Sequence, residues 1–230
     1  AYFNDVQRKA VKAAGRLAGL DVERLLNEPT AASLAYGLAD NREQKFLIFD
    51  LGGGTFDVSI VDMFEGVIEV RASSGDAWLG GDDFTQVIRQ WMQARYPALA
   101  DPNAACAAEL NRIAETFKCT LSQQDETSAA LNCNGEEYRW TLTAETFAEC
   151  AASLLTRLKK PVVQALQDAH FDPEHLDHVI LVGGATRMPI VRQMATRMFG
   201  RFPRSELNPD EVVALGAGVQ AGLIAQACAL

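Results

Sequence analysis

Short apolar runs alternate with amphipathic stretches along this chain of 230 residues. Two runs rich in Ile, Val and Phe, at 46–51 and 56–63, predict largely buried strands. A third strand is expected at 67–73, and a fourth at 179–182, where four apolar residues precede two glycines. These four runs are the candidate strands of one sheet.

Capping residues mark the helix boundaries. Asn4, with Gln7 three residues later, predicts a helix that runs to about residue 17 or 19. The final helix is expected from Asn208 as N-cap and Pro209 at its first position, and its recurring small residues predict close approach to another helix. Further helices are expected at about 30–38, 83–96, 104–121, 144–169 and 189–199, and a hairpin at 127–133 and 137–142.

Three consecutive glycines separate the first two strands and suggest more than a turn. Successive bare N–H groups in a turn form a concavity that suits an anion. Asp50 precedes the turn, Asp57 follows it, and Thr55 adds a hydroxyl between them. Glycines for phosphate and two acids for hydrated Mg²⁺ fit a nucleoside-triphosphate site, although a plain hairpin with solvated acids remains about equally good for this motif alone.

Three other patterns allow both a structural and a binding interpretation. Gly80–Gly81 before a helix is a possible anion site or a tight turn. Gly183–Gly184 after the fourth strand indicates either backbone contact with a nucleotide or a packed strand-to-helix turn. Glu115, Lys118 and Ser122 share one helix face, and an intrahelical ion pair explains them more simply than a ligand site.

Composition and charge exclude several functions. A hydrophobic content of 48% is enough for a sizeable core, and a net charge of −9 argues against nucleic acid or an anionic membrane as partner. No leader opens the chain, and both ends suggest a piece excised from a longer protein. Five cysteines without framework spacing predict reduced thiols in a cytoplasmic protein, and three histidines around an acidic loop favour a solvated loop over a zinc site.

Taken together, these segments resemble the nucleotide-binding domain of DnaK-type heat-shock chaperones, within the actin-like and sugar-kinase ATPase superfamily, with details similar to the HscC branch. The resemblance covers essentially the whole chain and rests on NEPTAASLAYG (27–37), FDLGGGTFDVS (49–59), LGGDDF (79–84), VILVGGATRMP (179–189) and NPDEVVALGAG (208–218). It implies an α/β fold, a ribonuclease H-like lobe of an actin-like ATPase.

The resemblance assigns a role to each motif. Asp50 and Asp57 would bind Mg²⁺ through water and orient the attacking water, with Thr55 on phosphate and Glu28 as a further acid. The residues implied to bind ATP or ADP are Gly52, Gly53, Gly54, Gly81, Glu115, Lys118, Ser122, Gly183, Gly184, Ala185, Arg187, Met188 and Asp210. Cys119 stands where some relatives stack an arginine on adenine, so a cation–π contact would be lost.

Domains and partners follow from the same resemblance. Residues 1–44 would be the trailing helices of lobe I and a crossover, 45–81 and 152–230 the core of lobe II, and 82–151 an α+β insertion. Arg24 matches a position that engages a J-domain co-chaperone, and the insertion is where relatives bind nucleotide-exchange factors. Peptide clients would bind a substrate domain outside this chain.

The resemblance also implies missing parts and competing functions. A DLGTT-like phosphate loop and a catalytic lysine of lobe I are absent from this sequence, so the chain alone is expected to hydrolyse ATP negligibly. A sugar or metabolite kinase of the same superfamily and an actin-like assembly protein are the alternatives. A Rossmann dehydrogenase is set aside, because no G-x-G-x-x-G joins a strand to a helix.

Overall fold

The structure, a computed structural model, describes residues 3–37, 43–64, 67–204 and 206–228. Its main sheet has four strands in the order β3-β2-β1-β6, with β1 antiparallel to β2 and parallel to β6. These strands are β1 Gln44–Leu51, β2 Phe56–Phe64, β3 Val67–Asp76 and β6 His178–Val182. All four strands expected from the apolar runs are therefore confirmed, and they form one sheet.

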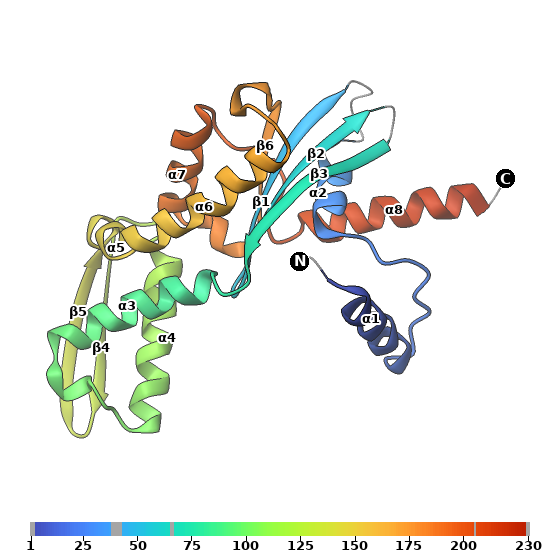
Figure 1. The fold of residues 1–230 in the computed structure, drawn as a ribbon. Coiled ribbons are helices and arrows are strands. Elements are labelled where there is room, and N and C mark those ends of the chain that lie inside the picture. Colours follow the sequence, from blue (N-terminus) through green and yellow to red (C-terminus); the bar gives the residue numbers. More distant parts are fainter. Residues whose placement is uncertain (1–2, 38–42, 65–66, 205, 229–230) are drawn as a thin grey trace.

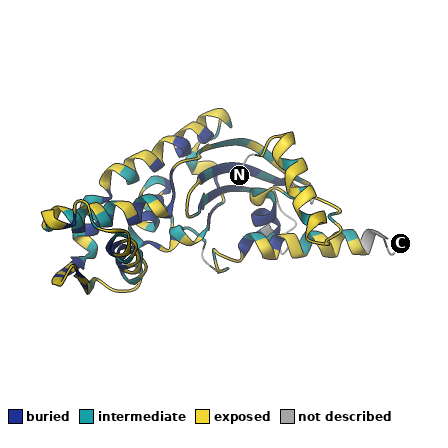
Figure 2. Cartoon of the chain, turned by 90° about the horizontal axis from the view of Figure 1, so that it is seen from below, coloured by how far each residue is buried: buried dark blue, intermediate teal, exposed yellow. Residues whose placement is uncertain are grey.

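Helices cover both faces of this sheet (Figure 1). The helices α2 Glu28–Gly37 and α8 Val212–Cys228 lie on one face, and α6 Ala152–Asp168 and α7 Pro189–Phe199 lie on the other. Each face has its own apolar core, one around Phe46 and Ile180 and the other around Phe49 and Leu181. The alternation of buried strands and half-exposed helices is visible in Figure 2.

A second unit extends from the end of β3. It contains α3 Gly81–Arg95, α4 Ala104–Thr120 and a separate two-stranded sheet, β4 Glu126–Cys133 and β5 Glu136–Thr143, followed by α5 Ala144–Cys150. The turn at Asn134 and Gly135, both with positive φ, confirms the expected hairpin. Trp140 donates from its indole nitrogen to the Met92 carbonyl at 3.0 Å and so fixes the hairpin to α3.

Three expectations for helices are corrected. The helix expected over 144–169 is two helices, because the chain turns at Ala151, ten residues before Pro161. The second helix, expected from about residue 30, begins at Glu28, so Glu28 is part of it. The last helix begins at Val212, since Asn208 uses its side-chain oxygen on the Asp210 amide and caps a turn over 209–211 instead.

The expectation that all cysteines are reduced is wrong. Cys106 in the first turn of α4 is bonded to Cys133 at the end of β4. The two cysteines are 27 positions apart, a separation that fits no spacing motif, and the hairpin brings the two thiols together by folding back on α4. Cys119 and Cys150 are the free cysteines among the side chains that the structure describes.

The close helix crossing expected from the small residues is confirmed. A Cβ at Gly216 of α8 would collide with the backbone carbonyl of Ala31 in α2. By contrast, the first helix, α1 Asp5–Leu17, has its capping box at Asn4 but buries none of its residues. It lies apart from the sheet in Figure 1 and contacts the start of α2, where Arg8 donates to Asn27 at 2.8 Å.

Candidate functional site

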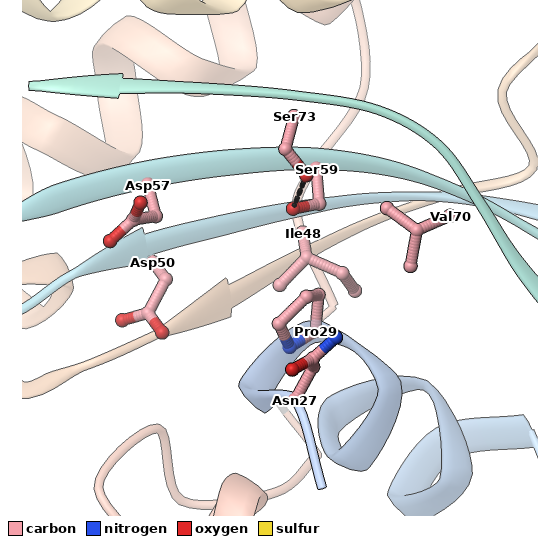
Figure 3. Close-up of a pocket in the computed structure, with 8 residues that line it drawn as sticks. All are labelled: Asn27, Pro29, Ile48, Asp50, Asp57, Ser59, Val70 and Ser73. Carbon is pink, nitrogen blue, oxygen red and sulfur yellow. Dashed lines mark hydrogen bonds between the residues drawn. The ribbon is translucent and has the colours of Figure 1, made fainter. Parts of the chain in front are cut away.

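The turn between β1 and β2 places two carboxylates side by side. Asp50 and Asp57 are directly paired in the antiparallel register, so their side chains project from the same face of the hairpin. Figure 3 shows both pointing away from the sheet beside the start of α2, where Asn27 and Pro29 complete a small pocket. Ser59, whose hydroxyl is hydrogen-bonded to that of Ser73 at 2.7 Å, also lines this pocket.

The carboxylate of Asp50 is destabilised in its charged form. Burial, together with the negative charges of Glu28 and Asp57, raises its pKa to about 6. Glu28 is the first residue of α2, and its neighbours Asn27 and Pro29 line the same pocket as the two aspartates. Three acids expected from the sequence therefore interact at one place, and a cation near them would relieve their repulsion.

The glycine turn offers backbone donors. The amide of Gly52 donates to the Thr55 carbonyl at 3.0 Å, which closes the turn. The amides of Gly53 and Gly54 donate to no described residue, and both glycines and Thr55 are exposed. Two adjacent amide donors on an exposed turn are suited to an anion.

The second glycine loop is joined to the first. Gly81 donates its amide to the Gly52 carbonyl at 2.9 Å, and Asp82 donates to the Gly53 carbonyl at 2.8 Å. A Cβ at Gly80 would collide with the backbone of Gly53, so this contact requires glycine. The first amides of α3 thus hold the carbonyl side of the hairpin turn and leave the turn's own amides for a ligand.

The turn after β6 packs against the same strand ends. Gly183 has φ 84°, and a Cβ there would collide with the Leu51 carbonyl and lie 3.1 Å from the Asp50 carboxylate. A Cβ at Gly184 would lie 2.9 Å from the Asp210 carboxylate. A short 3₁₀ helix, η3 Gly184–Arg187, follows and leads into α7. The carboxyl ends of the parallel strands β1 and β6 therefore form one edge of the site, as is usual for ligand sites in α/β sheets.

Arg187 is held by two side chains from the turn before α8. Its guanidinium donates to Asp210 at 2.6 and 3.0 Å and to the Asn208 side-chain oxygen at 2.5 Å. Both charged side chains are about half exposed, so this pair fixes geometry more than it adds stability. It orients the planar guanidinium at the mouth of the site.

A hydrogen-bonded cluster joins α4 to α3. Lys118, which is 8% exposed, donates to the carboxylate of Glu115 at 2.7 Å and to the Gly81 carbonyl and Thr85 hydroxyl, each at 3.0 Å. Burial raises the pKa of Glu115, but hydrogen bonds from Lys118 and Thr85 outweigh it and hold that pKa below its ordinary value. The pair is thus more than a surface ion pair, because it ties α4 to the second glycine loop.

These elements enclose one cavity, which we call the α4–η3 groove. On one side it is lined by α4 and on the other by η3 and the turn before α8. Ten residues expected from the sequence line it: Gly53, Gly81, Glu115, Lys118, Ser122, Gly184, Ala185, Arg187, Met188 and Asp210. Five segments that are far apart in the sequence are therefore brought to one groove.

Cys119 also lines this groove. Its thiol donates to the Glu115 carboxylate at 3.4 Å, and burial together with that carboxylate raises the pKa of the thiol. The neutral thiol is small and adds no cation to the groove wall.

The donor set suits Mg²⁺ through water and phosphate rather than by direct ligation. Within the described residues, no group of three or more His, Cys, Asp or Glu side chains is arranged to hold a metal ion. Mg²⁺ usually keeps several waters and binds through one or two carboxylates together with substrate phosphates. The facing carboxylates of Asp50 and Asp57 beside the free amides of Gly53 and Gly54 fit that mode.

Some functional residues escape sequence reasoning. Thr85 is 4% exposed and links Lys118 to Glu115, and Asn208 positions Arg187. Thr85 lies one helical turn after Gly81, a spacing that could have indicated it. The sequence predicts Asn208 only as a helix cap. Four of the expected residues do not line the groove themselves but are next to residues in the chain that do, or one position further: Gly52, Gly54, Thr55 and Gly183.

Arg24 lies elsewhere. It lines a groove formed by residues 20–26 and the outer surface of α8. None of the described helices has the length and apolar character needed to cross a membrane.

A ribonuclease H-like sheet with a glycine hairpin, two further glycine turns and an acidic edge defines a lobe of the actin-like ATPase class. The model of the Hsp70 protein family matches residues 1–228, and the chain belongs to the Hsp70 family. Hsp70 proteins are ATP-binding, and the kinase and filament alternatives are not favoured. The finer expectation of an HscC-like branch stays a prediction.

Several curated chaperones are similar along almost the whole chain. The chain is 48% identical to "Chaperone protein dnaK3" of Thermosynechococcus vestitus, with 98% of this chain and 35% of that protein covered. It is 47% identical to "Chaperone protein HscA homolog" of Ralstonia nicotianae (98% and 36%) and 46% identical to "Stromal 70 kDa heat shock-related protein, chloroplastic" of Pisum sativum (98% and 33%). The chain spans about a third of the length of these relatives.

Proposed function

We propose that this chain is the ATP-binding half of a chaperone ATPase domain whose whole protein couples ATP binding and hydrolysis to the binding of peptide substrates. The observation that carries the proposal is the α4–η3 groove, which gathers ten residues expected from five separate motifs. If the motifs were only separate turns and ion pairs, their residues would not be expected to line the same groove.

Adenosine would lie between the two walls of this groove. Glu115 and Ser122 on α4 present a carboxylate and a hydroxyl, and Lys118 fixes the Glu115 carboxylate in place. On the opposite wall, Gly184 and Ala185 of η3 line the groove. Arg187 closes the mouth, held by Asp210. Polar groups on one wall and backbone on the other suit the polar edge of a nucleoside and its ring face.

The phosphates would lie on the glycine turn. The amides of Gly53 and Gly54 would donate to the phosphate oxygens, with the Thr55 hydroxyl beside them. Asp50 and Asp57 would hold Mg²⁺ through water, and their carboxylates would orient the attacking water with Glu28 as a third acid. Bound Mg²⁺ would neutralise phosphate charge during phosphoryl transfer.

Hydrolysis by this chain alone should be negligible. Phosphoryl transfer depends on positioning and on charge stabilisation from several sides. Gly53, Gly54 and Thr55 are exposed to solvent in this chain, so phosphates bound there would face water on one side. Binding and hydrolysis are therefore separable properties of this lobe.

Partners are proposed on the same basis. The groove beside Arg24 would receive a J-domain co-chaperone, and the unit over 82–151 a nucleotide-exchange factor. Peptide clients would bind the part of the whole protein outside this chain. We place the protein in the cytoplasm, without nucleic acid or membrane partners, in keeping with its net charge of −9.

Calorimetric titration with Mg·ADP tests the proposal. We expect saturable binding that weakens at least tenfold in Lys118→Ala, because Glu115 loses the cation that orients it. Lys159→Ala, an exposed lysine on α6, is the matched control and should bind like the unmodified chain. Binding that is unchanged in a folded Lys118→Ala variant would contradict the placement of adenosine against α4.

A further inference from the structure

A second groove lies along α7, and we call it the α7 groove. Its lining is mainly apolar, with Leu181 of β6 and Pro203 on its surface. Arg192 and Arg197 of α7 also line it, one and a half turns apart, together with Phe202. Met188 and Pro189 at the start of α7 belong to other pockets, so the α7 groove is separate from the α4–η3 groove.

The aromatic ring in this groove is almost fully in water. Phe202 is 87% exposed, although Phe199, three residues earlier, is 7% exposed and packs in the core. An exposed aromatic side chain beside an apolar groove is a feature of interaction sites, because a bound partner would remove the ring from water.

The groove is positively charged in an otherwise acidic protein. Residues 187–204 contain five arginines and no Asp or Glu, whereas the whole chain has a net charge of −9. Arg187 and Arg204 are paired with Asp210 and Glu206. Within the part of the chain that the structure describes, Arg192 and Arg197 have no carboxylate partner.

We propose that the α7 groove binds an acidic segment of a partner protein through one apolar anchor residue. The anchor would pack on Phe202 and Leu181, and flanking Asp or Glu side chains would pair with Arg197 and Arg192. Arginine and aromatic residues are the side chains most enriched at the centres of interfaces, and charge complementarity selects acidic partners. Two unneutralised arginines are too few to hold a nucleic acid against the net negative charge.

Fluorescence anisotropy with defined peptides tests this proposal. The probes are four fluorescein-labelled 12-residue peptides, each with a central Leu, Ile, Phe or Trp flanked by glutamates, and four matching peptides with glutamines. We expect at least one glutamate peptide to bind the full chain saturably, and its glutamine counterpart to bind at least tenfold more weakly.

The variants separate this site from general electrostatic attraction. Phe202→Ser and Arg197→Glu should each weaken binding at least tenfold, and both positions are exposed, so folding should be unaffected. Lys159→Glu makes the same charge change at an exposed position of α6 and should leave binding unchanged.

Three outcomes would overturn the proposal. The first is that no glutamate peptide binds saturably. The second is that Lys159→Glu weakens peptide binding as much as Arg197→Glu does. The third is that Phe202→Ser has no effect on peptide binding. Sedimentation equilibrium of the chain without peptide adds a fourth: self-association that Phe202→Ser abolishes would assign the groove to a second copy of this chain.

Discussion

The crossing of α2 and α8 allows a matched pair of substitutions with opposite effects. Gly216 and Gly218 lie two residues apart in α8, but their surroundings differ completely. Gly216 is buried, and a Cβ there would collide with the Ala31 carbonyl and lie 2.9 Å from the Ala31 Cα. Gly218 is exposed, and a Cβ there would meet nothing within 4 Å.

The expected magnitudes follow from two physical effects. Replacing glycine by alanine within a helix contributes about 1 kcal/mol of stability, so Gly218→Ala should raise the free energy of unfolding by up to that amount. Gly216→Ala has the same helical gain, but overpacking costs about 1–3 kcal/mol, and here the obstacle is backbone that cannot rotate away. We therefore expect Gly216→Ala to be less stable than Gly218→Ala by roughly 3 kcal/mol.

Urea unfolding followed by circular dichroism measures this difference, and thermal unfolding should show it as well. For a chain of this size, about 1 kcal/mol corresponds to roughly 2–4 °C in Tm, so the two variants should differ by about 10 °C. Equal stability of the two variants, or a Gly216→Ala variant that gains stability, would refute the close crossing of α2 and α8.

Three further predictions concern the crosslink and the acidic side chains. Replacing both Cys106 and Cys133 by serine should lower the free energy of unfolding by about 3 kcal/mol, because the bond closes a loop of 27 residues; equal urea midpoints with and without the bond would contradict it. The raised pKa of Asp50, about 6, makes the folded state bind its proton more tightly, so this group's stabilisation is complete below pH 3.8 and is lost as pH rises through 6. Asp50→Asn should therefore be more stable than the unmodified chain at pH 7 by roughly 3 kcal/mol and about equal to it near pH 3.5, as seen in urea midpoints across pH. Lys118→Met should raise the pKa of Glu115 measured by ¹³C NMR, since the first hydrogen bond that lowers it is removed, and an unchanged value would refute the cluster.

Most of the fold was predictable from local pattern. The four strands are continuous apolar runs, and the hairpin at Asn134 and Gly135 follows from turn chemistry. The break at Ala151 was missed because no glycine or proline marks it; the preference for a long helix is overridden where the chain passes from the hairpin unit to the main sheet. The bond from Cys106 to Cys133 was missed because pairing depends on how the hairpin folds back on α4.

The residues of the candidate site also differ in how far the sequence predicts them. Motifs with glycine and acid at fixed spacing indicated Asp50, Asp57 and the glycine turns, because their function depends on neighbours in the chain. Lys118 and Glu115 could be assigned only through the family resemblance, since helical spacing alone favours an ordinary ion pair. Thr85 became evident only in the structure, where α3 and α4 meet.

The central claim is that Mg·ADP binds in the α4–η3 groove, with its phosphates on the glycine turn. A ¹⁵N-labelled NMR titration of the chain with Mg·ADP tests this most directly, because it reports each amide separately. We predict saturable shifts at the amides of Gly53, Gly54, Lys118 and Ala185, and none at Arg24 on the distant groove. Saturable shifts that leave these four amides unchanged would contradict the account.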